Sequence, residues 1–153
     1  MINIKHLSIT FDRVIFNDAD ITLYNNCITM IKGKSGTGKT TLLNQLGLVA
    51  PLSCEYLIDN HPIDDPLTTR KEKIGYVHQE STLFNNMTIK QNMEFAFLLS
   101  GQEYNENRMH DILCSMKIEH LIDQTPDHVS GGERQRAAIA FALMKDPSLL
   151  LLD

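Results

Sequence analysis

The chain has 153 residues, of which 42% are hydrophobic, and its 14 Lys+Arg against 19 Asp+Glu give a formal net charge of -5. This length fits a single domain over residues 1–153, and the apolar content excludes intrinsic disorder. The acidic balance argues against a nucleic-acid partner, no apolar run is long enough for a membrane helix, and three scattered cysteines indicate neither disulfides nor zinc.

The first part of the chain has the period-2 pattern of β-strands. Apolar side chains alternate with polar ones in residues 2–11, which predicts a half-buried strand and not the apolar core of a signal peptide. Residues 21–24 and 28–31 have the composition of further strands, separated by the turn-prone pair Asn25-Asn26. We therefore expect a β-rich N-terminal region in a cytoplasmic protein.

A glycine-rich segment follows and precedes a helix-forming run, TLLNQLGL. It has the G-x-x-x-x-G-K-[ST] pattern in the order strand, loop, helix that a phosphate-binding loop requires. The segment consists of Gly33, Lys34, Ser35, Gly36, Thr37, Gly38, Lys39 and Thr40, and Thr41 comes directly after it.

Each position of this segment has a chemical reason. Glycines let successive backbone N–H groups point at phosphate oxygens, and the start of the next helix adds its positive dipole end. Lys39 places a charge on the β- and γ-phosphates of ATP, and the Thr40 hydroxyl is a ligand for Mg²⁺. The alternative is a loop that only turns the chain, but a chance match is expected on the order of once in a few hundred sequences of this length.

The pattern becomes mostly helical later in the chain. Residues 56–58 and 74–77 are short strand candidates on either side of a loop with two prolines. Thr88 and Gln91 then form a capping box for a helix to about Ser100, with Gly101 at its end. These features predict an α/β fold with a helical insertion at residues 80–128.

Two more helices and a final strand complete the pattern. Asn105 can cap a helix whose apolar face consists of Met109, Ile112, Leu113 and Met116. Ser130 and Glu133 form a second capping box for a helix ended by Asp146-Pro147. Leu149–Leu152 is the continuous apolar run expected of a strand buried on both faces of a parallel sheet.

The segment V-S-G-G-E-R-Q-R, residues 129–136, resembles the signature sequence of ATP-binding cassette (ABC) ATPases. An ordinary capped helix explains Ser130 and Glu133 but not the paired Gly131 and Gly132. Glycines at a helix N-terminus let backbone amides approach an anion closely. In the family, two ATPase domains dimerise head to tail, and each signature closes on the γ-phosphate held by the other domain.

Three further positions resemble elements of this family. Phe11 lies where the family has an aromatic side chain that stacks on adenine. Gln79 resembles the Q-loop glutamine, which contacts Mg²⁺ and the attacking water, and Asp153 resembles the Walker B aspartate, which holds Mg²⁺ through water. Alternatively, Phe11 is the last inward side chain of its strand, Gln79 is an ordinary polar residue at a strand end, and Asp153 frays at the terminus.

The resemblance implies a P-loop NTPase fold with a mostly parallel core sheet and an N-terminal antiparallel β subdomain. Residues 74–136 are similar to ATPases of lipoprotein-release, macrolide-export and bacteriocin-export systems. The implied partners are an integral membrane permease and a second copy of the chain, and the implied location is the inner face of the cell membrane. Alternatives are a nucleotide-binding remnant without hydrolysis and a soluble ABC protein not tied to transport. A P-loop kinase leaves the paired glycines unexplained.

After the Walker B strand, the family continues with a catalytic glutamate, a D-loop and a strand ending in a switch histidine. The resemblance therefore implies a core sheet that is incomplete at the C-terminus of the 153-residue chain. We expect such a chain to bind MgATP, to hydrolyse it slowly, and to aggregate or pair its strand edges with another copy.

Overall fold

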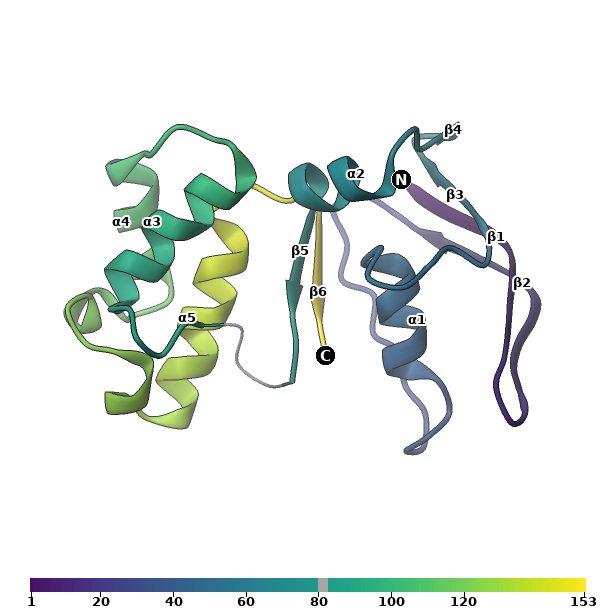
Figure 1. The fold of residues 1–153 in the computed structure, drawn as a ribbon, viewed down its shortest axis with the longest axis horizontal. Coiled ribbons are helices and arrows are strands. Elements are labelled where there is room, and N and C mark those ends of the chain that lie inside the picture. The colour runs from purple at the N-terminus through teal and green to yellow at the C-terminus, as the bar shows by residue number, and fades with distance from the viewer. Residues whose placement is uncertain (80–82) are drawn as a thin grey trace. The chain divides into compact units, whose positions relative to one another are not determined.

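The computed structural model describes residues 1–79 and 83–153, which form two compact units, Met1–Arg70 and Lys71–Asp153 (Figure 1). We call them unit 1 and unit 2. Residues 80–82, with which the predicted helical insertion begins, lie outside the described residues. The predicted single domain over residues 1–153 and the insertion boundaries stay predictions.

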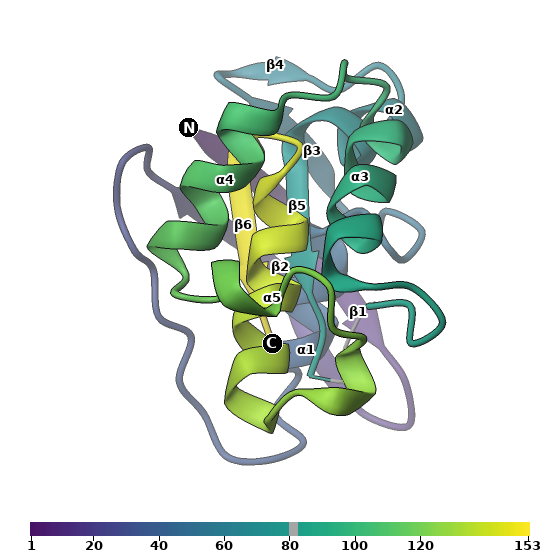
Figure 2. The same ribbon diagram turned by 90° about the vertical axis from the view of Figure 1, so that its left-hand side faces the viewer.

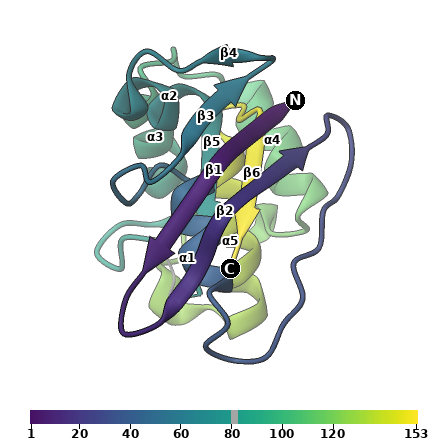
Figure 3. The same cartoon turned by 90° about the vertical axis from the view of Figure 1, so that its right-hand side faces the viewer.

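Unit 1 is built on a four-stranded antiparallel sheet in the order β2-β1-β3-β4 (Figure 3). The strands are β1 (Ile2–Thr10), β2 (Val14–Leu23), β3 (Glu55–Ile58) and β4 (His61–Pro62). The strands predicted at residues 2–11, 21–24 and 56–58 are confirmed. β2 begins earlier than predicted, because the polar run Asn17-Asp18 hides its alternation.

A β-bulge explains why the buried positions of β1 change parity between Ile4 and Leu7. Ile4 pairs with Ile21 and Leu7 pairs with Ala19, so β1 has one more residue than β2 in this interval. His6 lies in the bulge with φ +57°, and its ring nitrogen Nδ1 lies 2.7 Å from Asp18 Oδ1. The bulge keeps the apolar side chains of both halves of β1 in the core.

The helix α1 (Lys39–Leu46) packs on this sheet through its apolar side. Leu42, Leu43 and Leu46 are buried, and the buried hydroxyl of Tyr56 on β3 donates to the Leu46 carbonyl at 2.9 Å. The helix predicted after the glycine-rich segment is confirmed. These contacts hold the second half of α1 in unit 1, and the loop of residues 33–40 leads directly into the first half.

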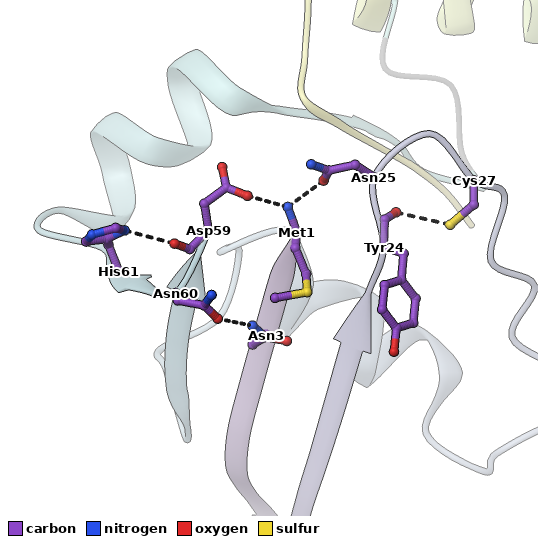
Figure 4. Close-up of polar contacts among 8 residues, drawn as sticks. All are labelled: Met1, Asn3, Tyr24, Asn25, Cys27, Asp59, Asn60 and His61. Carbon is purple, nitrogen blue, oxygen red and sulfur yellow. Dashed lines mark hydrogen bonds and ion pairs between the residues drawn. The ribbon is translucent and has the colours of Figure 1, made fainter.

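Polar contacts fasten one end of the sheet (Figure 4). The N-terminal ammonium of Met1 contacts the Asp59 and Asn25 side chains, and Asn3 Nδ2 donates to Asn60 Oδ1 at 3.1 Å. Asp59 and Asn60 both have positive φ, as the two central residues of a tight β-hairpin turn require. The β3–β4 hairpin is thus attached to the first residues of the chain.

The strand predicted at residues 28–31 is absent from the described residues. Ile28 is 98% exposed, Met30 is also exposed, and residues 27–34 have no strand assignment. A strand exists only when a neighbour satisfies its backbone hydrogen bonds, and no described segment pairs with this one. The strand prediction for residues 28–31 is therefore wrong, because a local pattern cannot supply the partner strand.

Unit 2 combines a two-stranded parallel sheet with three longer helices (Figure 2). The strand β5 (Ile74–Val77) pairs in parallel with β6 (Leu149–Leu152). The helices are α3 (Ile89–Ser100), α4 (Glu106–Ser115) and α5 (Gly131–Leu143), with the short 3₁₀ helices η1 (Glu119–Leu121) and η2 (Pro126–His128) between α4 and α5. The helix α2 (Pro66–Lys73) contains the boundary between the two units.

Small side chains let the elements of unit 2 approach closely. The buried face of α5 consists of Ala137, Ala138, Ala140 and Ala142. On β5, a Cβ atom at Gly75 would lie 3.1 Å from the Ala142 carbonyl oxygen and 3.0 Å from Pro147 Cγ. The core continues through the fully buried Met93 and Leu113 of α3 and α4, so the apolar face predicted for residues 109–116 is confirmed.

The helix starts follow the predicted caps, whereas one predicted helix end and the predicted burial of the last strand differ. Thr88, Asn105 and Ser130 cap their helices as expected. α5 ends at Leu143, before Asp146-Pro147, and Arg108 donates to the carbonyls of Leu143 and Met144. Leu149–Leu152 is a strand, but it is not buried on both faces, since only Leu151 is buried and Leu152 is 54% exposed. Within the described residues β6 pairs with β5 alone, which leaves its side chains partly accessible.

Candidate functional site

The loop formed by residues 33–40 lies exposed at the start of α1 in unit 1. Gly36 and Gly38 have φ of +76° and +96°, a left-handed conformation that favours glycine. The ammonium of Lys39 folds back over the loop and donates to the Gly33 and Lys34 carbonyls, at 3.1 and 2.9 Å. The loop therefore holds a cation at its own centre, next to the positive end of a helix.

Two of the loop glycines are also required by close packing. A Cβ atom at Gly38 would lie 2.4 Å from Ile15 Cγ2 of β2. A Cβ atom at Gly33 would lie 2.7 Å from Thr37 Oγ1, which donates to the Lys34 carbonyl at 2.8 Å. Any side chain at these positions would displace the strand behind the loop or the hydrogen bond within it.

The predicted adenine-stacking residue lies on the β1–β2 turn of the same unit. Phe11 is 67% exposed, so it is not the last inward side chain of its strand. Its backbone N–H donates to the Arg13 carbonyl at 3.0 Å, which closes the turn. The Arg13 guanidinium in turn donates to the Gly36 carbonyl. Unit 1 thus brings Phe11 and the glycine-rich loop together through Arg13, a residue that the sequence analysis missed.

The remaining predicted residues of this loop occupy its rim and the first turn of α1. Lys34, Ser35 and Thr40 are exposed, and Thr41 is half-buried. The first turn of α1 contains no acidic side chain that would repel an anion. The positive charges of the loop and of this helix start can therefore act on the same anionic group.

The predicted second anion site is the turn of residues 130–133 at the start of α5 in unit 2. Ser130 and Glu133 form the predicted capping box, in which the Ser130 N–H and hydroxyl donate to Glu133 Oε2 at 2.8 and 2.6 Å. These hydrogen bonds hold the pKa of the Glu133 carboxyl below its ordinary value. The capping box orders the turn with the carboxylate charged.

The paired glycines of this turn are not required by the packing of the chain. A Cβ atom at Gly131 would meet nothing within 4 Å, and one at Gly132 would meet only the Arg136 guanidinium, at an ordinary 3.6 Å. Neither residue has a left-handed φ. The described residues thus give no internal reason for glycine here, in contrast to Gly33 and Gly38.

A cavity of about 490 Å³ in unit 2 brings three predicted site residues together. Gln79 and Asp153 line it from the ends of β5 and β6, and Gly131 lines it from the start of α5. The Asp153 N–H donates to the Val77 carbonyl at 3.0 Å, so Asp153 continues the ladder of the two strands instead of fraying. Burial raises the pKa of Tyr76 to about 12, and the charge of Asp153 adds to this rise.

Arg134 is a second residue that the sequence analysis missed. It follows the capping box on α5, lines the cavity, and donates to Asn85 Oδ1 at 3.0 Å and Asp127 Oδ1 at 3.4 Å. The segment with Asn85 is held by the buried Asn92, which exchanges hydrogen bonds with the Phe84 N–H and carbonyl. Only the arginine-rich composition of residues 134–136 could have indicated an interaction of this kind.

Comparison with known proteins identifies one family. A family model described as "ABC transporter" matches residues 16–153. The molybdenum import ATP-binding protein ModC of Vibrio parahaemolyticus is 40% identical over 143 residues, which cover 89% of this chain. The chain spans 38% of the length of that relative.

Solved structures with the same fold come from the same family. A dimeric structure of MJ0796, a bacterial ABC transporter cassette, is 28% identical and has a TM-score of 0.86 over 100% of this chain and 73% of that chain. A dimeric post-hydrolysis state of the same cassette, bound to ADP and Pi, has a TM-score of 0.85 at the same identity and coverage.

In residues 1–79 and 83–153, no helix is long and apolar enough to cross a membrane.

Proposed function

Since the chain belongs to the ABC transporter family, as the match over residues 16–153 establishes, we propose that it binds MgATP and drives transport as the ATPase subunit of a transporter. Its fold is that of the ABC ATPase cassettes, α/β with an antiparallel N-terminal sheet, helices and a parallel sheet. The observation that carries the proposal is the exposed loop of residues 33–40, with two left-handed glycines and the Lys39 ammonium held at its centre.

The loop supplies the chemistry that a triphosphate needs. Its backbone N–H groups and the start of α1 bind phosphate oxygens, and Lys39 neutralises the β- and γ-phosphates. Phe11 stacks on the adenine, which the exposed position of its ring permits. The other contacts come from Lys34, Ser35, Thr37, Thr40 and Thr41 on the loop and the first turn of α1.

The oxygen-bearing side chains fit Mg²⁺, which prefers oxygen ligands. Thr40 offers a hydroxyl in unit 1, and Gln79 and Asp153 offer oxygens to one cavity in unit 2. Within the described residues no group of three His, Cys, Asp or Glu side chains could hold a metal ion by itself. When bound, Mg²⁺ neutralises charge on the transferring phosphate, and Gln79 orients the attacking water.

The turn of residues 130–133 is proposed to bind the γ-phosphate held by a second copy of the chain. The open space around Gly131 supports this role, because glycine there serves close approach from outside the chain. The capping box orders the helix N-terminus for an anion, and the Ser130 hydroxyl, which donates to Glu133 Oε2, would exchange this partner for a phosphate oxygen. A head-to-tail dimer then joins each loop of residues 33–40 to the partner's turn of residues 130–133.

Sedimentation velocity with MgATP tests this dimer. The expected result is a nucleotide-dependent dimer for the wild type and none for Lys39→Ala, which loses the cation that holds the triphosphate. Lys32→Ala removes an exposed cation just before the loop and is expected to dimerise like the wild type. A wild-type chain that stays monomeric while saturated with MgATP would refute the dimer.

The proposed partner is an integral membrane permease, which places the chain on the inner face of the membrane. The similarity to molybdenum import ATP-binding proteins supports an import system for an oxyanion of this type. The similar proteins reported above do not support export of a bacteriocin or another substrate, which the resemblance of residues 74–136 implied. That local resemblance keeps export of a peptide, lipoprotein or drug-like substrate as a second candidate.

Uptake of radiolabelled molybdate distinguishes the two directions. In cells whose only copy carries Lys39→Ala, an import role predicts a loss of high-affinity molybdate accumulation, with Lys32→Ala as the matched control. Unchanged accumulation in the Lys39→Ala cells, with new sensitivity to a peptide or drug, would favour export.

A further inference from the structure

The turn that carries Phe11 is attached to the phosphate-binding loop by one side chain. The Phe11 N–H donates to the Arg13 carbonyl, and the Arg13 guanidinium donates to the Gly36 carbonyl. The second contact bridges 23 residues of sequence, so it depends on the folded hairpin and not on local conformation. Arg13 therefore joins the two parts of the nucleotide site that lie in unit 1.

A second contact, which does not involve Arg13, packs the β1–β2 hairpin against the loop of residues 33–40. Ile15 and Phe16 of β2 lie so close to Gly38 that a Cβ atom there would be 2.4 and 3.5 Å from their side chains. This apolar contact fixes the base of the hairpin below the loop. The exposed end of the hairpin, with Phe11 at its tip, has Arg13 as its link to the loop among the contacts described here.

We propose that Arg13 is a positioning residue that holds the adenine-stacking turn of Phe11 at a fixed place beside the phosphate-binding loop. The proposal rests on the nucleotide-binding function proposed above. A guanidinium is planar and directional, so its hydrogen bond fixes the orientation of the turn as well as its distance. Without this bond the exposed turn samples more conformations, and adenine must order it on binding.

The contact also bears on the loop. Because a peptide unit is planar, a guanidinium that holds the Gly36 carbonyl on one side fixes the Thr37 N–H on the other. That N–H points back into the loop, 3.4 Å from the Lys34 carbonyl. This N–H keeps the Lys34 carbonyl as its acceptor without Arg13, so Arg13 is expected to act on nucleotide binding through the Phe11 turn and does not need to touch the nucleotide.

A double-mutant cycle on MgATP affinity, measured by calorimetry, tests the proposal. Phe11→Ala is expected to weaken binding roughly tenfold through loss of stacking, and Arg13→Ala roughly fivefold through loss of one charged hydrogen bond. The double variant is expected to bind no more weakly than Phe11→Ala, because Arg13 acts through Phe11. Arg13→Lys keeps a charged donor and is expected to restore part of the loss.

The same calorimetric measurement of MgATP affinity supplies the control and the outcomes that would contradict the proposal. Lys5→Ala removes an exposed cation from β1 for which the described residues give no hydrogen bond or ion pair, and it is expected to bind like the wild type. Additive losses in the double variant, or an Arg13→Ala affinity equal to that of Lys5→Ala, would overturn the proposal. If neither the wild type nor Lys39→Ala binds MgATP, the proposed nucleotide-binding function is wrong. If the wild type binds, Lys39→Ala does not, and Arg13→Ala binds like the wild type, the function stands and only the positioning role of Arg13 is wrong.

Discussion

Single glycines in the two segments proposed to bind anions have different structural reasons. Gly38 is required by the chain itself, since its φ is +96° and a Cβ atom would overlap Ile15. Gly131 has open space around it and an ordinary helical position. The same residue type therefore serves folding in one segment and, by our proposal, recognition in the other.

Alanine substitution separates these two roles. Gly38→Ala is expected to destabilise the fold by about 1–3 kcal/mol, because a non-glycine residue there is strained and overpacked. Gly131→Ala is expected to leave thermal unfolding unchanged while it weakens MgATP-dependent dimerisation. Melting curves and sedimentation velocity on both variants check this. A Gly131→Ala chain that unfolds early would show that the glycine serves packing instead.

The charge of Glu133 gives a prediction about pH. Its pKa is held below the ordinary value of 4.5 by hydrogen bonds from Ser130, so the folded state favours the carboxylate. The contribution of the capping box is then fully present above pH 4.5 and is lost as the pH falls through the lowered pKa. An NMR titration is expected to give Glu133 a lower pKa in the wild type than in Ser130→Ala. Equal values in the two chains would contradict the capping role.

At the scale of elements, features set by residues within one turn can be predicted from the sequence, whereas contacts between distant residues cannot. The three helix caps at Thr88, Asn105 and Ser130 follow from side chains within one turn, and the structure has all three. The strand predicted at 28–31 requires a partner strand, which no local pattern provides. Arg13 and Arg134 were missed for the same reason, since Gly36 lies 23 residues from Arg13 and Asn85 lies 49 residues from Arg134.

The buried Asn92 is the clearest energetic test at this scale. Its amide group donates to the carbonyls of Phe84, Met87 and Thr88 and accepts from the Phe84 N–H at 2.8 Å. Asn92→Ala removes the acceptor of the buried Phe84 N–H and the side-chain donor of these carbonyls, although those of Phe84 and Thr88 keep a backbone N–H donor, and it is expected to cost about 2–4 kcal/mol of stability. Denaturant unfolding measures the change. Asn107→Ala, at an exposed position of α4, is the control and is expected to differ from the wild type by less than about 0.5 kcal/mol.

At the scale of the whole molecule, each of the two units contains some of the residues of the proposed nucleotide site. Unit 1 holds the loop of residues 33–40 with Phe11 and Arg13, and unit 2 holds the turn of residues 130–133 with Gln79 and Asp153. The family and the fold could be predicted from the sequence because the motifs are short and their order along the chain is fixed. The proposed transport direction could not, since residues 74–136 resemble one group of family members and the similarity over 143 residues is to another.

The central claim is that the loop of residues 33–40 binds a magnesium nucleotide through the Lys39 ammonium. Titration calorimetry of MgATP into the wild type, Lys39→Ala and Lys32→Ala tests it most directly. We expect saturable one-to-one binding for the wild type and Lys32→Ala. For Lys39→Ala we expect an affinity at least roughly tenfold weaker, because one charged contact to phosphate is lost. Equal affinities for the wild type and Lys39→Ala, with all three chains folded, would contradict it.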